Sequence, residues 1–280
     1  MNWLERIESG IATKYLVQVH ETTAEVTRVE RPDKTIICFS TQIGCAIGCK
    51  FCASGMGGPS RSLTMAEMYR LIQIAYRDPA SPFMNGDIKP LLLSAMGEGE
   101  PAFCISQLDR LFNLTITDNV KGAVSTSAPS CKLLKRMCEK FEPLGIKIQY
   151  SLHSADQRIR RLMMPNAKAN PIEVLDILRK YPKVELNIVL FDGMNDTADD
   201  CMAIIGLLDQ VPHDWKIKLN RGNQIQGGPI PASMAKMEMF AAQITTFSKY
   251  EVELYFTDGG DINAACGQLR TGGTGYLPQA

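Results

Sequence analysis

The chain has 280 residues, 45% of them hydrophobic and 21% charged, which is enough for one large core and typical of a single α/β domain near the upper size limit. Because 30 basic residues balance 30 acidic ones, the net charge of zero excludes a global field that attracts polyanions and leaves local patches as the alternative. The chain has nine cysteines and no signal-like stretch over residues 1–12, which favours a cytoplasmic protein over a disulfide framework. It has no apolar run of roughly 18 residues, the length that a membrane span needs.

Short apolar runs alternate with amphipathic helical patterns along most of the chain. Strands are predicted at residues 35–39, 90–95, 122–126, 147–152, 184–191, 216–220 and 252–256. Helical spacing of apolar residues recurs at residues 65–76, 171–179, 197–210 and 232–248. Repeated βα units predict a parallel sheet or barrel whose functional site lies at the carboxyl ends of the strands.

The motif after the first predicted strand is Cys45-Ala-Ile-Gly-Cys49-Lys-Phe-Cys52, with three and then two residues between its thiols. Ferredoxin-type motifs supply four thiolates to clusters that only transfer electrons. Three thiolates leave the fourth iron of a [4Fe-4S] cluster open, and the amino and carboxylate groups of S-adenosylmethionine can chelate it. One electron from the cluster can then split the sulfonium and release a 5′-deoxyadenosyl radical. Phe51 would shield adenine and sulfur from water.

A zinc knuckle and a set of three buried thiols are the alternatives for this motif. A tetrahedral zinc site needs a fourth Cys or His nearby. However, His20, His153 and His213 are all far from the motif in sequence. Because clustered cysteines of cytosolic proteins indicate metal binding or catalysis, the spacing favours the iron–sulfur interpretation.

Polar motifs follow the next three predicted strands. A Gly-Glu-Gly-Glu-Pro run at 97–101 follows the second strand, where its glycines would let the backbone approach a ligand and Glu100 could accept a hydrogen bond from an ammonium group. Ser127 ends the third strand, and Ser151 and His153 end the fourth, where hydroxyls could bind ribose or carboxylate. A simple turn at 97–101 and a core position for His153 are the alternatives.

Two basic runs, at 132–136 and 158–161, are candidate nucleic-acid patches. Charge runs on helices are more often solvated faces, which is the alternative interpretation here.

Several motifs in combination resemble one family. They are Ile37-Cys38-Phe-Ser-Thr-Gln-Ile-Gly-Cys45, the Gly-Glu-Pro turn, the Ser-Leu-His strand end, Asn195-Asp196 and Gly260-Asp-Ile-Asn-Ala-Ala-Cys266-Gly-Gln-Leu269. The chain resembles the RlmN/Cfr radical SAM adenine methyltransferases from about Glu25 to Leu269, and the Ala-Ala-Cys-Gly-Gln-Leu ending is the most specific element. The resemblance implies an α/β fold, a partial or full TIM-like radical SAM barrel with parallel strands. It would span residues 25–270, between a short stub at 1–24 and a flexible tail at 271–280.

The resemblance also implies a two-cysteine mechanism. Cys266 matches the cysteine that takes a methyl group from one S-adenosylmethionine by displacement. The radical from a second molecule abstracts hydrogen from that S-methyl group, and the methylene radical adds to an adenine carbon, expected to be carbon 2, with carbon 8 as the alternative. Cys38 matches the cysteine that resolves the adduct by attacking the Cys266 sulfur, and external thiols reduce the resulting disulfide. Packing roles are the alternative for both cysteines.

Other site residues carry over from the resemblance one at a time. Glu25 matches a carboxylate near the target base, with a surface strand glutamate as the alternative, and Asn223 matches an asparagine near cofactor and substrate. Five further positions fall where the cofactor is held: Gly99, Glu100, Ser127, Ser151 and His153. The implied partners are RNA or an adenine nucleotide as substrate and an electron donor such as flavodoxin or ferredoxin.

Three departures from the family concern RNA. Family members usually have an N-terminal accessory domain for RNA binding, whereas only residues 1–24 precede Glu25 here. The usually basic stretch before the final motif reads Thr257-Asp-Gly-Gly260, and the loop at 56–61 is short of positive charge. With zero net charge, these departures favour a short RNA, a nucleotide or a partner protein that binds RNA. Modification of a small metabolite or peptide, or a non-catalytic iron–sulfur protein, is the alternative function.

Overall fold

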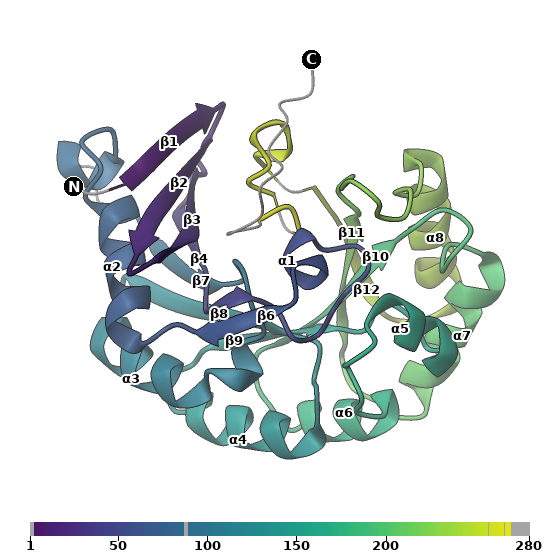
Figure 1. Ribbon diagram of the computed structural model, residues 1–280. Coiled ribbons are helices and arrows are strands. Elements are labelled where there is room, and N and C mark those ends of the chain that lie inside the picture. Colours follow the sequence, from purple (N-terminus) through teal and green to yellow (C-terminus); the bar gives the residue numbers. More distant parts are fainter. Residues whose placement is uncertain (1–2, 87–88, 257, 266, 270–280) are drawn as a thin grey trace.

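A ten-stranded sheet organises the fold, and it curves into an open crescent (Figure 1). The computed structural model describes residues 3–86, 89–256, 258–265 and 267–269. Seven neighbouring strands are parallel and follow chain order: β4 (Thr35–Phe39), β7 (Leu91–Ala95), β8 (Val120–Thr126), β9 (Lys147–Ser151), β10 (Val184–Leu190), β11 (Lys216–Arg221) and β12 (Glu251–Tyr255). Because β1 and β12 are the two ends of the strand order, the described sheet is a partial barrel, as the fold prediction allowed.

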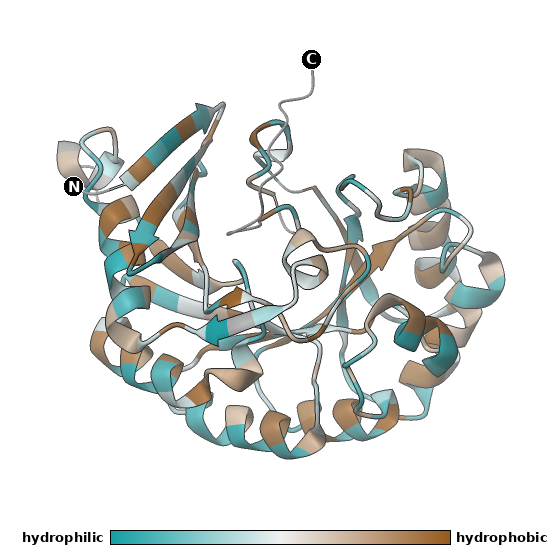
Figure 2. Ribbon diagram, in the orientation of Figure 1, coloured by the Kyte–Doolittle hydropathy of each residue, from teal (hydrophilic) through white to brown (hydrophobic). Residues whose placement is uncertain are grey.

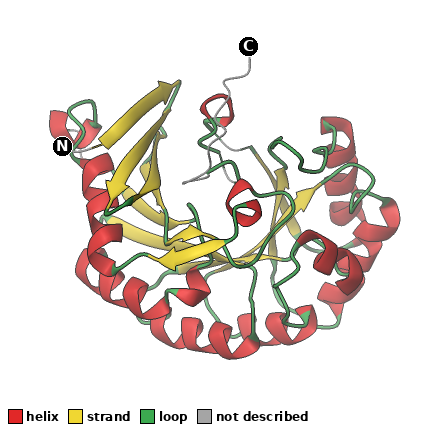
Figure 3. Cartoon of the chain, in the orientation of Figure 1, coloured by secondary structure: helices red, strands yellow, loops and turns green. Residues whose placement is uncertain are grey.

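Helices form the outer layer of the crescent and strands the inner one (Figure 3). Six helices lie along the convex side: α2 (Met65–Tyr76), α3 (Ile105–Thr115), α4 (Cys131–Phe141), α6 (Pro171–Leu178), α7 (Ala198–Asp209) and α8 (Met234–Phe247). Five of them begin after a polar N-cap whose side chain accepts a backbone hydrogen bond: Thr64, Ser130, Asn170, Thr197 and Ser233. These helix crossovers are what allow successive strands to lie parallel.

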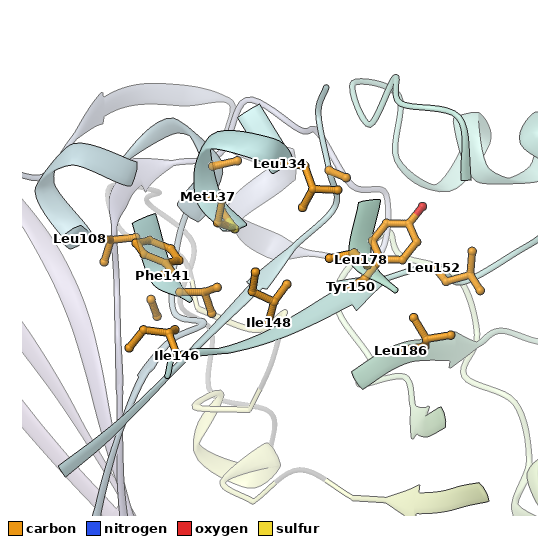
Figure 4. Packing of buried hydrophobic residues seen from close by; sticks show 14 of the residues in the cluster. Leu108, Leu134, Met137, Phe141, Ile146, Ile148, Tyr150, Leu152, Leu178 and Leu186 are labelled. Carbon is orange, nitrogen blue, oxygen red and sulfur yellow. The ribbon is translucent and has the colours of Figure 1, made fainter. Parts of the chain in front are cut away.

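The main core lies between the sheet and the outer helices. Figure 2 shows hydrophobic and hydrophilic residues alternating along these helices, as their sequences predict. In Figure 4, Met137 and Phe141 of α4 meet Ile146 and Ile148, and all four side chains are fully buried. This packing fixes the outer layer and leaves the concave face of the sheet for the cavity described below.

Shorter elements complete the described chain. They are β5 (Gln42–Gly44), β6 (Pro59–Ser62), α1 (Ala53–Met56), α5 (Gln157–Met163) and the 3₁₀ helices η1 (Pro82–Asn85), η2 (Pro101–Phe103) and η3 (Gly260–Ile262). Strands β5 and β6 pair antiparallel as a separate two-stranded sheet. Within the described residues, no helix is both long and apolar enough to cross a membrane.

The amino-terminal segment differs from the expected stub. Strands β1 (Trp3–Ser9), β2 (Ala12–Val19) and β3 (Thr22–Glu30) form an antiparallel meander that pairs with β4 and extends the main sheet. Thr13 and Lys14 are buried with their apolar neighbours in β2, so the polar–apolar alternation typical of a strand is absent there. The proposed boundary at residue 25 remains a prediction, and residues 271–280 lie outside the described part of the chain.

Candidate active site

A cavity of about 780 Å³ opens along the barrel, and its volume falls within the range of small-molecule sites. The three cysteines of the motif line it together with residues at the carboxyl ends of several parallel strands. The predicted site residues that line it are Cys45, Cys49, Phe51, Cys52, Gly99, Glu100, Ser127, Ser151, His153 and Asn223. The fold therefore brings most of the predicted site to one place.

The cysteine loop leaves β5 and returns through α1 to β6. Gly44 has φ 71°, and a Cβ built there would lie 1.9 Å from the carbonyl oxygen of Gly58, so only glycine fits. A Cβ on Gly55 would lie 2.6 Å from the backbone nitrogen of Cys49. Cys52 is the N-cap of α1. These close backbone contacts fold the loop back on itself and turn all three cysteines toward one cavity.

Burial determines the protonation of the cysteine thiols. It raises the pKa of Cys45 to about 12 and the pKa of Cys49 well above its usual value, and the nearby Glu100 carboxylate adds to both shifts. Thiols in such surroundings stay protonated unless a metal stabilises the thiolates. Among the described residues, no three His, Cys, Asp or Glu side chains already stand in a metal-binding arrangement. The donor set itself, three cysteines on one loop facing one cavity, fits a cluster with an open coordination position.

Glu100 accepts several hydrogen bonds from the protein itself, and its expected hydrogen bond with an ammonium group stays a prediction. Its carboxylate accepts hydrogen bonds from the backbone nitrogens of Ala102 and Ser127 and from the hydroxyls of Thr126 and Ser127, at 2.6 to 3.0 Å. Burial raises the pKa of Glu100, and these hydrogen bonds oppose the shift. Because both oxygens are occupied, the carboxylate joins the turn after β7 to the end of β8 and positions the Ser127 hydroxyl at the cavity.

The glycines of the same run lie close to other parts of the protein, Gly97 to backbone and Gly99 to side chains. A Cβ on Gly97 would lie 2.7 Å from the backbone of Phe39 and Ser40, and one on Gly99 would lie 2.6 Å from the Thr41 hydroxyl. The expected approach of a ligand to these glycines stays a prediction. They also let the turn after β7 pack against the chain that leads into the cysteine loop.

His153 and Phe51 form an aromatic wall of the cavity. Their ring centroids are 5.2 Å apart with edge-to-face geometry, and Phe191 lies 5.3 Å from Phe51 on another side. Nδ1 of His153 accepts a hydrogen bond from the Val189 nitrogen at 3.2 Å. Burial lowers the pKa of His153 to about 3, and the nearby Arg160 contributes to the decrease. The imidazole is therefore neutral near pH 7.

Arg160 is a buried residue that supports the cavity wall, which its charged sequence context did not predict. It belongs to the basic run considered as a solvated face or nucleic-acid patch, yet its side chain is fully buried. The guanidinium donates to the carbonyl oxygens of Ser127, Ser151 and Leu152, which end β8 and β9. Arg160 thus holds two cavity-lining serines in place. The sequence shows it only as one of several basic residues in a row, and nothing there indicates that this one is buried.

Cys38 and Glu25 lie on neighbouring strands beside the cavity. The pairing of Thr27 with Cys38 puts Glu25 and Cys38 on the same face of the sheet as Ile36, which lines the cavity. Glu25 is only 3% exposed, so the alternative of a surface glutamate is wrong. Its carboxylate lies 3.1 Å from the ammonium of Lys14 on β2, a buried partner that the sequence did not reveal.

The segment around position 266 crosses this same face. Ile262 and Ala264 pack against Ala12 and Val29 on β2 and β3. The Lys14 ammonium also donates to the carbonyl oxygen of Asn263 at 3.2 Å. Figure 1 shows this yellow segment next to α1 above the concave side of the sheet.

The residues after position 266 bind the cysteine loop. The carbonyl oxygen of Gly267 accepts from the Ala53 nitrogen at 2.7 Å, and that of Leu269 accepts from the Ser54 hydroxyl. Gly267 itself lines the cavity. Cys266 lies outside the described residues, so its role stays a prediction.

Comparison with known proteins defines the class. Residues 39–205 match the model of the radical SAM superfamily. The crystal structure of a radical SAM methyltransferase from Sphaerobacter thermophilus superposes with a TM-score of 0.87 and 27% identity, over 96% of this chain and 81% of that one. TYW1 with a lysine–pyruvate adduct shares the fold at TM-score 0.58 and 15% identity, over 88% and 87% of the two chains. Fold and family match together define a radical SAM enzyme.

Curated relatives narrow the class. A probable dual-specificity RNA methyltransferase RlmN 3 of Opitutus terrae is 33% identical, over 95% of this chain and 76% of the relative. The RlmN proteins of Nautilia profundicola and Desulfotalea psychrophila are 30% and 28% identical, over 96% of this chain and 82% and 76% of theirs. The chain therefore belongs to the RlmN family of radical SAM enzymes and is an S-adenosylmethionine-dependent radical methyltransferase.

Proposed function

We propose that this enzyme methylates an adenine carbon in RNA, with carbon 2 as the expected position. The relatives named as RNA methyltransferases support the substrate class. One observation carries the chemistry: the motif thiols, the strand-end serines and Gly267, which follows Cys266, all border a single cavity. A cofactor and a target base held in this cavity would lie between the motif thiols and the segment that contains Cys266, as the two-cysteine mechanism requires.

Cys45, Cys49 and Cys52 would hold a [4Fe-4S] cluster, and the cavity would take S-adenosylmethionine, used twice per turnover. Together these groups supply a 5′-deoxyadenosyl radical. The described residues give the cavity its character. Phe51 and the neutral His153 form an apolar wall, and the Ser127 and Ser151 hydroxyls offer hydrogen bonds without charge. Asn223 adds an amide to the cavity lining.

The two thiols have separate roles in the proposal. Cys266 carries the methyl group, and Cys38 attacks the Cys266 sulfur once the base is joined to it. A sulfur–sulfur bond would then form while the carbon–sulfur bond to the base breaks. The carbon would keep that electron pair and take up a proton to become the methyl group on the base. Two external thiols, or one dithiol, must afterwards supply the two electrons that reduce the disulfide. The position of Cys38 on the face that residues 262–264 cover supports this pairing. Glu25, held by Lys14 on that face, is the proposed carboxylate near the base.

Mass spectrometry of the purified protein tests this proposal directly. After reconstitution with iron, sulfide, reductant and S-adenosylmethionine, we expect one methyl group on the peptide that contains Cys266. A Cys266→Ala variant should carry no such methyl group, and it provides the control for nonspecific alkylation. A reconstituted, S-adenosylmethionine-cleaving protein without methyl on Cys266 would contradict the assigned chemistry.

A further inference from the structure

A basic surface lies over the cysteine loop. Two segments build it, residues 44–52 and residues 157–170, which begin with α5. The Lys50 nitrogen donates to the Met163 carbonyl oxygen at 2.9 Å, and the Asn166 nitrogen donates to that of Ile47 at 3.2 Å. Beneath it, Cys45 and Ile47 pack with Met163 and Met164. The surface and the thiol loop therefore form one packed unit.

The charge of this unit is one-sided. No Asp or Glu occurs at positions 42–66 or 157–172 of a chain whose net charge is zero. The cluster-loop surface consists of these exposed residues: Lys50, Arg158, Arg161, Leu162 and Lys168. The Leu162 side chain is 68% exposed. The adjacent Asp156 pairs with Arg158 at 2.8 Å, so the positive charge is concentrated on the other three cations.

We propose that the cluster-loop surface docks an acidic, one-electron-donating redox protein of the flavodoxin or ferredoxin type. This inference rests on the proposed function, because that reaction consumes an electron from outside. In the transfer the donor is oxidised by one electron and the cluster held by the motif thiols is reduced by one. Lys50 is adjacent to Cys49, so a partner on this surface lies next to the thiol loop. Complementary charge speeds such short-lived encounters, and redox partners use small interfaces.

RNA is the other polyanion that a basic surface attracts. Surfaces that bind unpaired RNA usually include aromatic side chains for base stacking. No Phe, Tyr or Trp occurs at positions 157–172, where the exposed large apolar residues are Leu162 and Ile172. Phe51, the aromatic residue of segment 44–52, lines the cavity beside His153. The proposed base site, near Glu25 and Cys38, belongs to β3 and β4 rather than to α5. These observations favour the protein partner.

Charge reversal tests the proposal. We would compare Arg161→Glu/Lys168→Glu with Lys132→Glu/Lys135→Glu, a control with the same change of charge at exposed positions on α4. Calorimetry with purified, oxidised flavodoxin measures binding without turnover. We expect about tenfold weaker binding at low ionic strength for the first variant, unchanged binding for the control, and wild-type affinity that falls as salt is added.

A second readout separates docking from catalysis. Cleavage of S-adenosylmethionine driven by reduced flavodoxin should slow in Arg161→Glu/Lys168→Glu, whereas cleavage driven by dithionite should match the wild type. Unchanged flavodoxin affinity in this variant would overturn the proposal. Weaker RNA binding with unchanged flavodoxin binding would also overturn it and assign the surface to RNA. Failure of the wild type to cleave S-adenosylmethionine with dithionite would instead contradict the proposed function.

Discussion

At the residue scale, the buried polar groups determine which side chains reach the cavity. Glu100 and Arg160 each tie strand ends together through several hydrogen bonds. Ser127 is held by both, at its hydroxyl by Glu100 and at its carbonyl oxygen by Arg160. Two buried charges of opposite sign thus position a neutral hydroxyl at the cavity wall.

Cys38→Ala should leave the enzyme unable to turn over but able to react with substrate once. Without the resolving thiol, methylated Cys266 would join the base and stall as a covalent protein–RNA complex, whose carbon–sulfur bond survives denaturation. A denaturing gel with labelled RNA would show the complex. Cys266→Ala should give no complex and is equally inactive in turnover, so rates alone do not separate the two variants. A complex in Cys266→Ala would contradict the assigned order.

His153 should make folding stability depend on pH. Because burial lowers its pKa from 6.5 to about 3, the unfolded chain binds a proton more readily than the folded one. Its contribution to stability is therefore complete above about pH 6.5 and is lost progressively as pH falls towards 3. Urea midpoints at pH 7 and pH 5 should differ less for His153→Gln, which keeps an acceptor but does not titrate. An equal pH dependence in both proteins would refute this assignment.

At the element scale, the cysteine loop is held by short flanking elements together with its own backbone hydrogen bonds, such as the one from the Cys52 nitrogen to the Cys49 carbonyl oxygen. Strands β5 and β6 join its two ends, α1 turns it toward the cavity, and the segment after Cys266 binds α1 through Ala53 and Ser54. A substitution that distorts β5 or β6 should therefore lower the amount of iron bound while the outer helices keep their structure.

Gly44→Ala should impair the loop much more than Gly58→Ala. Both glycines have a left-handed backbone, with φ of 71° and 69°, so both variants carry a conformational cost of about 1 kcal/mol. Only at Gly44 would the new Cβ overlap a backbone oxygen, whereas nothing lies within 4 Å at Gly58. Iron bound per chain after reconstitution should drop in Gly44→Ala and stay near the wild-type value in Gly58→Ala. Equal loading would show that the contact has no effect on the site.

At the scale of the whole molecule, the open crescent explains why the site draws on such distant parts of the chain. The concave side is bounded by the β1–β3 meander at one end and by β10 to β12 at the other. Residues 258–265 and 267–269 cross it, and they bind Ala12 and Lys14 on one side and α1 on the other. The most amino-terminal and most carboxyl-terminal described elements therefore close the site together.

Because the net charge is zero, we expect few contacts with RNA phosphates and therefore a weak dependence of RNA affinity on salt concentration. Affinity for RNA depends on the phosphates contacted, and each contact with single-stranded RNA contributes a slope of about 0.7 in a plot of log affinity against log salt. We expect a short adenine-containing RNA to be methylated at least as readily as intact ribosomal RNA, with a shallow slope. Initial rates at several salt concentrations measure both. A strong preference for long RNA with a steep salt dependence would contradict this expectation.

The sequence by itself determined the parallel strands, the cysteine motif and the strand-end serines. Strands β4 and β10 and helix α2 follow from local periodicity, and α2 begins with a capping box, Thr64 and Glu67, that is readable from spacing alone. The three motif cysteines are close in sequence, so a single loop is enough to bring them to the same cavity.

Only the tertiary structure decided the buried charges and the amino-terminal strands. Lys14 reaches Glu25 and Asn263, and Arg160 reaches Ser127, through pairings that depend on strand register and helix packing. A basic residue looks the same in sequence on a solvated face and in the interior, because its burial depends on which carbonyl groups distant segments bring to it. The β1–β3 meander was not predicted for the same reason: the buried Lys14 interrupts the apolar pattern of β2.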